Sequence, residues 1–412
     1  MRTQPWAQLL GVAGHRIDPM SNTLQLLRDM IAIPSVNPMR ANSGEHVEQG
    51  MANFIETVLA RAGIDCERQP ITKGRDNVIG IVQPTVTGAK GLMLNSHMDT
   101  VPVDNMSIAP FDPIVENGHV FGRGSCDAKA SIASMLSAVI EYANQPERNA
   151  TVMFVATADE EFGFSGAWKL IEKSWPVSAC VIGEPTLLQR VIAHKGIVRW
   201  RIRVQGVSAH GAIPELGRSA IYDGARVALA LEEYAQQLAQ RESHPLLGQP
   251  TLNVGKISGG QSVNIVPDKC VFEVERRLLP GEDGHDAMQE CEEFLHGRLG
   301  PRVQLTFEEH YLVDPALETA PNAQIVSALA QAQQATLGCE RELTGAHYGT
   351  DGSKLAKTGI ETVVCGPGDI AQAHTGNEFV EFEQVELATR MYSHLLKNFL
   401  PQKSIKGSRD FF

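Results

Sequence analysis

Residues 151–161 read Thr-Val-Met-Phe-Val-Ala-Thr-Ala-Asp-Glu-Glu, an apolar run that ends in three consecutive carboxylates. A short continuous apolar run is typical of a strand that is buried on both faces, as in a parallel sheet. Similar runs occur at 91–95 and 177–183, and apolar residues at helical spacing lie between them, for example at 131–143. The chain is therefore predicted to be an α/β protein with a mostly parallel sheet covered by helices.

The pattern changes at about residue 195. Residues 198–204 read Val-Arg-Trp-Arg-Ile-Arg-Val, a strict alternation that is typical of an antiparallel strand with one face in water. Further predicted strands and two predicted helices continue to about residue 310, where the α/β pattern returns. We predict an N-terminal arm (1–21), a first segment of the α/β domain (22–194), an inserted α+β domain (195–310) and a second segment of the α/β domain (311–412).

Acidic residues outnumber basic residues by 48 to 36, which gives a formal net charge of -12. Nucleic acids and anionic membranes bind clustered positive charge, so neither is expected as a partner. Seven cysteines are scattered without a Cys-x-x-Cys pair, which favours a reducing compartment and gives no thiolate metal site. No apolar run is long enough to span a membrane, and residues 1–20 lack the features of a secretory signal. We therefore expect a cytoplasmic protein.

Residues that bind metals follow the predicted strands. Ligand sites of parallel sheets lie beyond the carboxyl ends of the strands, and turns there usually use Gly, Asn or Pro rather than Glu and His. The candidates are His97 and Asp99 after residues 91–95, Asp127 in a glycine-bracketed loop before a helix, Glu160 and Glu161 after residues 151–157, Glu184 after residues 177–183, and His374 after the strand expected at 362–365. Their convergence predicts a metal site.

The ligand set indicates two metal ions. Imidazole and carboxylate suit zinc, cobalt or manganese, and two histidines with three carboxylates are too many ligands for one tetrahedral zinc ion. Two ions that share one bridging carboxylate explain the set. In an extended chain His97 and Asp99 lie on one face, which lets Asp99 hydrogen-bond the far nitrogen of His97. Glu160 and Glu161 would point opposite ways, one to a metal and the other to the attacking water as general base.

Five motifs occur in order along the chain: His97-Met98-Asp99-Thr100-Val101-Pro102, Gly122-Arg123-Gly124-Ser125-Cys126-Asp127-Ala128-Lys129, Asp159-Glu160-Glu161, Gly183-Glu184-Pro185 and Ala373-His374-Thr375. Their order and spacing resemble the dinuclear zinc family of acetylornithine deacetylase, succinyl-diaminopimelate desuccinylase, aminoacylase and glutamate carboxypeptidase. The resemblance covers residues 22–400. It implies a catalytic α/β domain with an inserted lid that also forms a homodimer.

The resemblance also implies roles for these residues. His97, Asp127 and Glu184 would hold one zinc ion (Zn2+), and Asp127, Glu161 and His374 the second, with Co2+ or Mn2+ as possible substitutes. Glu160 would be the catalytic base, Asp99 would orient His97, and the peptide bond after Asp127 would be cis. These assignments make Asp127 the bridging ligand.

Three segments would contribute to substrate binding or catalysis, according to the same resemblance. Ser208-Ala209-His210-Gly211 contains a lid histidine that would reach the active site of a partner subunit and polarise the scissile carbonyl. Asn264 and Arg277 lie in lid motifs that bind the substrate carboxylate. The loop Tyr348-Gly349-Thr350-Asp351-Gly352-Ser353 matches a substrate-side loop. Gly349 and Thr350 would bind a carboxylate through backbone N–H groups, and an ordinary capped helix start is the alternative.

The predicted function is metal-dependent hydrolysis of the amide bond of an N-acyl-L-amino acid. A carboxypeptidase or dipeptidase of the same family, acting on a short peptide, is the alternative, because both reactions cut an amide next to a free carboxylate. A non-catalytic amino-acid-binding protein on this fold would be expected to lack a ligand or the base, and all of them are present here.

Overall fold

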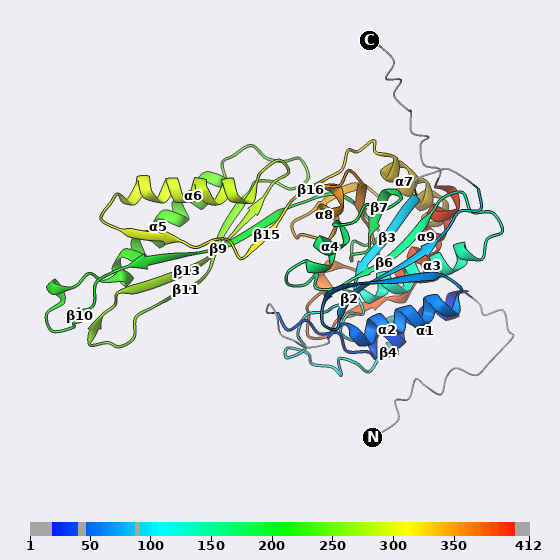
Figure 1. Ribbon diagram of the computed structural model, residues 1–412, viewed down its shortest axis with the longest axis horizontal. Coiled ribbons are helices and arrows are strands. Elements are labelled where there is room, and N and C mark those ends of the chain that lie inside the picture. The colour runs from blue at the N-terminus through cyan, green and yellow to red at the C-terminus, as the bar shows by residue number, and fades with distance from the viewer. Residues whose placement is uncertain (1–18, 40–46, 87–90, 400–412) are drawn as a thin grey trace, which may run out of the picture.

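The structure is a computed structural model that describes residues 19–39, 47–86 and 91–399. It has two lobes, a larger one that contains both ends of the described chain and a smaller, elongated one (Figure 1). Most of the predicted N-terminal arm lies outside the described residues. Among the described residues, no helix combines the length and apolar character needed to cross a membrane.

The larger lobe is built on a nine-stranded sheet. In spatial order its strands are β1 (Asp65–Thr72), β2 (Arg75–Val82), β6 (Val152–Thr157), β3 (Gly91–His97), β7 (Val177–Ile182), β18 (Glu361–Val364), β8 (Arg190–His194) and β16 (Leu317–Glu318), and β17 (Leu343–Ala346) also pairs with β8. The central strands β6, β3, β7 and β18 are parallel, and β2 and β8 flank them as antiparallel neighbours. The predicted α/β fold class is confirmed.

Alternate residues of β6 pack into two different cores, because successive strand side chains point to opposite faces. Phe154 belongs to the core under one set of helices: α1 (Pro19–Ile31), α2 (Gln49–Arg61), α3 (Lys129–Ala143), α7 (Gln324–Leu337) and α9 (Phe382–Asn398). Met153 and Val155 belong to the core under α4 (Ser165–Leu170) and α8 (Gly352–Ala356). Each such fully buried side chain contributes about 1.5–3 kcal/mol.

The smaller lobe, called the lid here, has a five-stranded sheet of β11 (Thr251–Gly259), β13 (Lys269–Leu278), β9 (Gly196–Gln205), β14 (Gln304–Phe307) and β15 (Leu312–Asp314). Its β9 carries the predicted alternation, with Trp200 buried and Arg199 and Arg201 partly exposed. Helices α5 (Ala220–Leu238) and α6 (Gly284–Leu299) cover the apolar face (Figure 1). The lid sheet ends at Asp314 rather than at residue 310, because β15 pairs with β9.

The chain passes between the two lobes twice, first at Gly196 and again after Asp314. These two connections lie against each other. At the first crossing, a Cβ on Gly196 would lie 2.6 Å from the Asp314 carbonyl oxygen, so the close approach requires glycine. At the second crossing, the fully buried Asp314 carboxylate pairs with Lys354 and accepts a hydrogen bond of 2.9 Å from Ser353. Both crossings are therefore fixed to α8 of the larger lobe.

The sequence predicted most long elements and missed some short ones. The apolar spacing of residues 45–62 is typical of a helix, and α2 begins at Gln49. Residues 40–46 lie outside the described part of the chain. The edge strand β1 and the short strands β8, β16 and β17 were not predicted. Because β1 mixes charged and apolar residues without clean alternation, its sequence carries little periodic signal.

Candidate active site

The candidate ligands lie at the carboxyl ends of the central strands. His97 ends β3, Glu184 follows β7 by two residues, and Glu161 lies in the turn after β6. Asp127 lies in the loop before α3, and His374 follows the short 3-10 helix η3 (Ile370–Gln372). Strand order β6–β3–β7 brings the first three together, since parallel neighbours end on one side of the sheet.

Asp127 lies between the two histidines. Its Oδ1 is 2.9 Å from His97 Nε2, and its Oδ2 is 3.3 Å from His374 Nε2. Glu184 Oε1 lies 3.7 Å from the same nitrogen of His97, and Glu161 Oε2 lies 3.2 Å from that of His374. The ligand atoms thus form two groups that share one carboxylate.

This donor set fits divalent cations. Ligand atoms of His97, Asp127 and Glu161 all lie within 4.8 Å of one another, and within the described chain Glu161 Oε1 is buried without a hydrogen-bond partner. Burial raises the pKa of Glu161 and of Glu184 to about 7, because a buried carboxylate is costly without a compensating positive charge. The donor atoms are oxygen and nitrogen, as zinc, cobalt and manganese accept.

The charges around Asp127 shift the pKa values of the ligands on either side of it. Hydrogen bonds to Asp127 and Glu161 raise the pKa of His374 to about 10. Burial alone would raise the pKa of Asp127, but hydrogen bonds from His374 and His97 hold it below its usual range. Metal ions compete with protons for such ligands. The electrostatic field of the site therefore favours positive charge on both sides of Asp127.

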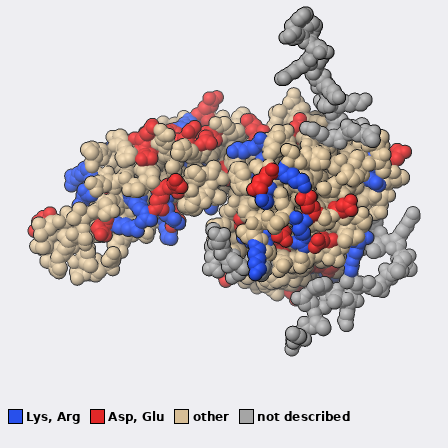
Figure 2. All heavy atoms as spheres, in the orientation of Figure 1, with Lys and Arg blue, Asp and Glu red and all other residues tan. Residues whose placement is uncertain are grey.

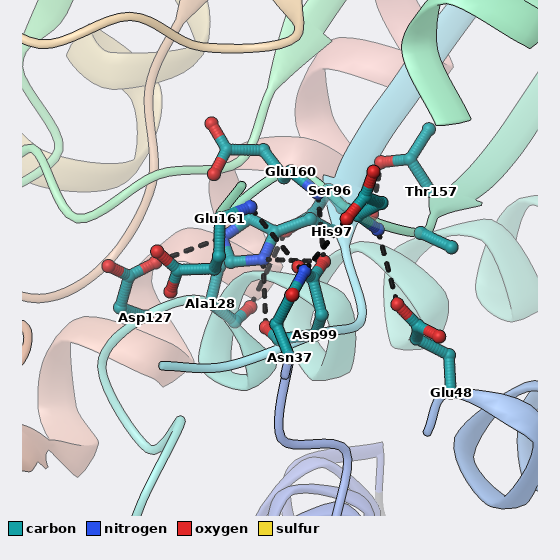
Figure 3. A network of polar contacts seen from close by, with 12 residues as sticks. Asn37, Glu48, Ser96, His97, Asp99, Asp127, Ala128, Thr157, Glu160 and Glu161 are labelled. Carbon is teal, nitrogen blue, oxygen red and sulfur yellow. Dashed lines mark hydrogen bonds and ion pairs between the residues drawn. The ribbon is translucent and has the colours of Figure 1, made fainter. Parts of the chain in front are cut away.

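Asp99 hydrogen-bonds the turn that follows β6 rather than the imidazole of His97 directly. His97 Nδ1 lies 2.9 Å from the main-chain oxygen of Asp99, whereas the Asp99 carboxylate is 3.6 Å away. That carboxylate accepts the backbone N–H groups of Glu160 and Glu161, each at 3.1 Å (Figure 3). The expected interaction with His97 therefore comes mainly from the backbone carbonyl, because the carboxylate is occupied by the turn.

Glu160 and Glu161 lie in a turn, and the expectation of an extended segment is wrong. Asp159 has a left-handed φ of 65°, which reverses the chain directly after β6. Both glutamates line the same pocket. Burial raises the pKa of Glu160 well above its usual range. The turn therefore directs both carboxylates to the ligand cluster from one short segment.

Known proteins match this sequence and this fold. The family model described as peptidase family M20/M25/M40 matches residues 93–398. The chain belongs to this family. It is thus an enzyme of the M20 metallopeptidases and deacetylases, and the resemblance seen in the sequence is confirmed.

The alignments of this M20 chain with its curated relatives cover nearly its whole length. An acetylornithine deacetylase of Myxococcus xanthus is 31% identical over 380 residues, which cover 89% of this chain and 95% of the relative. An acetylornithine deacetylase of Vibrio cholerae is 30% identical over 397 residues, which cover 92% of this chain and 99% of that relative.

Solved structures of low sequence identity share the fold. The aminopeptidase PepT of Bacillus cereus has a TM-score of 0.74 at 21% identity and covers 92% of this chain and 98% of its own. An M20 family metallo-carboxypeptidase of Sulfolobus solfataricus has a TM-score of 0.73 at 20% identity, and the match covers 92% of this chain and 99% of the carboxypeptidase. The two-lobed architecture is therefore that of the M20 fold.

A buried network under the turn of this M20 enzyme was not predicted from the sequence. Asn37 Nδ2 donates to the carboxylates of Asp99 (2.8 Å) and Asp159 (2.9 Å). Arg75 donates to Asp159 at 3.0 Å and pairs with Glu48, whose carboxylate also accepts the Asp159 N–H. These five side chains come from five separate segments of the chain. The network fixes the first residue of the turn that carries Glu160.

A second unpredicted residue, Glu378, holds the loop of the bridging aspartate. Its Oε1 accepts the backbone N–H groups of Cys126 (2.9 Å) and Asp127 (3.0 Å), and its Oε2 accepts that of Gly124 (3.1 Å). Arg123 Nη1 lies 2.7 Å from the same carboxylate, and both side chains are buried. The peptide bond after Asp127 is cis, as the resemblance implied.

The position of Glu378 follows from strand pairing. It directly precedes β19 (Phe379–Glu381), which pairs with β5 (His119–Phe121), and β5 directly precedes the loop of Asp127. The same short segment carries His374 four residues earlier. The pairing therefore couples the ligand His374 to the loop of Asp127.

The predicted substrate residues are divided between two places. Arg277 and Gly349 line the pocket with the ligands. His210 lies in β10 (Ala209–His210) at the far end of the lid, and its neighbour Asn264 precedes β12 (Ile265–Val266), which pairs with β10 (Figure 1). Within one chain, Asn264 and Arg277 are therefore not brought together.

The side chain of Thr350 closes the turn before α8. Thr350 is fully buried, and its hydroxyl accepts the N–H of Gly352 at 3.1 Å. Its carbonyl accepts hydrogen bonds from Ser353 and Lys354. Gly349 lines the pocket with the candidate ligands, and the role of Thr350 in substrate binding stays a prediction.

We predict that Glu378→Gln weakens zinc binding about 10- to 100-fold, because residues that orient metal ligands typically have effects of this size. The amide cannot accept three backbone N–H groups and also neutralise Arg123. Isothermal titration with Zn2+ measures the change. Glu381→Gln, an exposed change three residues further along the chain at the end of β19, is the matched control. Equal zinc affinities in the two variants would contradict the role of Glu378.

We predict that Arg75→Met lowers kcat about 10- to 100-fold with a smaller effect on KM, because small displacements of a catalytic group are costly. The change leaves the Glu48 and Asp159 carboxylates without their guanidinium. Steady-state kinetics well below the melting temperature measures it. Arg68→Met, on the neighbouring strand β1 with a partly exposed guanidinium bound to Glu56, is the control. Arg75→Lys should restore part of kcat, and wild-type kcat in Arg75→Met would exclude the network from catalysis.

Proposed function

We propose that this chain hydrolyses the amide bond of an N-acyl-L-amino acid with two zinc ions as cofactors, and that Co2+ or Mn2+ can replace them. One observation supports this most: Glu160 lines the same pocket as the shared carboxylate of Asp127 and the guanidinium of Arg277. A base, a metal cluster and a carboxylate-binding group at one pocket are what hydrolysis of such an amide requires. The curated relatives named acetylornithine deacetylase favour the deacylase reaction.

The residues of the chain divide the chemistry between them. Two divalent ions, when bound to the five ligands, supply Lewis-acid polarisation of the amide carbonyl and a lowered pKa of water. Glu160 accepts the proton of the attacking water and then donates it to the leaving amine. Asp99, through the N–H groups of Glu160 and Glu161, keeps the base at a fixed position relative to the ligands. Arg277 pairs with the α-carboxylate of the substrate.

A carboxypeptidase or dipeptidase reaction on a short peptide is the second candidate. Both reactions use the same base and the same carboxylate-binding group. The pocket encloses about 310 Å³, which suits a small ligand better than an extended peptide. A non-catalytic amino-acid-binding protein is disfavoured because the complete ligand set and the base are present.

We further propose that the chain is a homodimer in the cytoplasm, with residues 195–310 as the dimerisation lid on a catalytic domain of 22–194 and 311–412. Figure 2 shows a largely uncharged surface at the free end of the lid. Large apolar side chains are exposed there and along α5 and β11: Val207, Ile213, Leu216, Ile221, Tyr222, Leu229, Ile257, Val263 and Ile265. Within the described chain, β11 pairs on one side only. An apolar edge of this kind supports association of two copies.

The dimer gives His210 and Asn264 a role that one chain does not give them. Both lie at the exposed end of the lid, away from the pocket of their own chain. A lid that crosses to the partner would bring His210 to the carbonyl oxygen there, where an imidazole stabilises the oxyanion. Asn264, whose main-chain carbonyl accepts the N–H of Gly211 next to His210 at 2.7 Å, would reach the same site.

We expect the zinc-loaded protein to release free amino acid from N-acetyl-L-alanine, N-acetyl-L-methionine or N-acetyl-L-ornithine faster than it cuts matched dipeptides. Glu160→Gln should retain both metals and lose turnover by about 10²–10⁴-fold, the range for removal of a general base. Liquid chromatography of the released amino acid and metal analysis of the same samples provide the measurements. Faster cleavage of the dipeptides would select the peptidase, and full activity of Glu160→Gln would contradict the proposed base.

Mixing two inactive variants tests the crossed lid. His210→Ala and Glu160→Gln homodimers should each be nearly inactive. After exchange of subunits, a heterodimer has one complete site, so a statistical mixture should recover about a quarter of wild-type activity. If His210 served its own subunit, every site of the mixture would lack one group and no activity would return.

A further inference from the structure

The charged residues of the pocket fall into two groups. Five of them belong to the metal cluster or serve as the base: Asp127, Glu160, Glu161, Glu184 and His374. The remaining charged lining residues in the described chain are Arg199 and Arg277, both from the lid sheet. The proposed reaction uses Arg277 for the α-carboxylate and gives Arg199 no task. Its presence at the pocket therefore needs an explanation.

Glu275 holds the two guanidinium groups side by side. It lies directly opposite Arg199 in the pairing of β13 with β9, two residues before Arg277 on the same face. Its Oε2 accepts Arg199 Nε at 2.7 Å and lies 2.6 Å from Nη2, while its Oε1 accepts Arg277 Nε at 2.7 Å. Burial opposes the effect, but the two arginines lower the pKa of Glu275. The three side chains form a fixed unit at the pocket wall.

One carboxylate cannot neutralise two guanidinium groups, so a positive charge remains at this wall. A guanidinium has five N–H donors. Within the described residues, the donors of Arg199 Nη1 have no hydrogen-bond partner, and Arg277 Nη1 reaches only the His347 carbonyl at 3.4 Å. Both arginines therefore retain donors for further carboxylates in the pocket.

The pocket offers no matching group for a positively charged side chain. Apart from the metal cluster and the base, the described pocket lining contains no carboxylate, and Glu275 beside it is already shared by two arginines. An ammonium group, as in an ornithine side chain, would face like charge at this wall. Between the arginines and the cluster, the lining is mainly apolar or aromatic, for example Ile197, Leu312 and Tyr348. Such a surface suits the methylene groups that link two carboxylates.

We propose that Arg199 forms a second anion-binding subsite and that the preferred substrate carries a carboxylate in addition to its α-carboxylate. This proposal rests on the proposed amide hydrolysis and names its substrate class. The second carboxylate lies either on the amino-acid side chain, as in an N-acetylated acidic amino acid, or on the acyl group, as in an N-succinyl amino acid. In both cases the charge-assisted pair with Arg199 supplies the selectivity.

The test compares four substrates: N-acetyl-L-glutamate, N-succinyl-L-alanine, N-acetyl-L-alanine and N-acetyl-L-ornithine. In the wild-type protein, at least one of the two dicarboxylates should exceed N-acetyl-L-alanine in kcat/KM about tenfold or more, and N-acetyl-L-ornithine should be the poorest. The dicarboxylate that is preferred identifies the source of the second charge. A preference for N-acetyl-L-ornithine over both dicarboxylates would overturn the proposal.

Arg199→Met should lower kcat/KM for the preferred dicarboxylate about 10- to 100-fold, mainly through KM, and change N-acetyl-L-alanine less than about threefold. Arg199→Lys should restore part of the loss. Arg201→Met is the matched control, because Arg201 lies two residues along the same strand and pairs with Glu273 and Glu308 outside the pocket. An equal loss on all substrates would mean that Arg199 only positions Arg277 through Glu275, and that outcome would overturn the subsite.

Measurements of substrate binding test the Arg199 subsite independently of amide hydrolysis. Calorimetry on Glu160→Gln should show N-acetyl-L-glutamate or N-succinyl-L-alanine binding about tenfold more weakly after Arg199→Met is added, with N-acetyl-L-alanine unchanged. If the wild-type protein cuts none of the four amides but this selective binding persists, the proposed reaction fails and the subsite stands. If binding is the same with and without Arg199, the subsite fails whatever the turnover.

Discussion

The contact of the Asp127 carboxylate with two histidines from opposite ends of the chain is the constraint on which the site depends. His97 ends a central strand, and His374 arrives from the last quarter of the sequence. Each meets a different oxygen of the same carboxylate. The carboxylate keeps this position because Glu378 holds the backbone of its loop through three N–H groups. The fold thus places both histidines against one carboxylate.

The two lobes contribute side chains of opposite charge to the pocket. The larger lobe contributes the acidic cluster, including Glu160, and the lid contributes Arg199, Arg277 and their shared Glu275. A strongly acidic group of side chains thus faces a basic wall across a small volume. Such opposed charges orient a substrate whose carboxylate must face away from the reacting bond.

Much of the fold and the cluster could be predicted because the relevant signals are local. The apolar run before Asp159 indicates a buried strand, and the residues after each strand indicate the ligands. Glu378, Arg75 and Asn37 carry no such signal, since each acts on a segment that strand pairing brings to it from far along the sequence. The contact of Asp99 was mispredicted for the same reason. Its carboxylate accepts hydrogen bonds from the backbone N–H groups of residues 160 and 161, which are distant in sequence, rather than from the nearby imidazole of His97.

The crossings between the lobes have a mechanical consequence. The Asp314 carboxylate ends the second crossing, binds Lys354 under the pocket, and lies so near Gly349 that an added Cβ would be 2.2 Å from its Oδ2. Lys354 in turn lies over the ring of Phe164, which lines the pocket. Any displacement of the lid relative to the larger lobe would therefore be passed to Phe164 at the pocket through the Asp314–Lys354 ion pair.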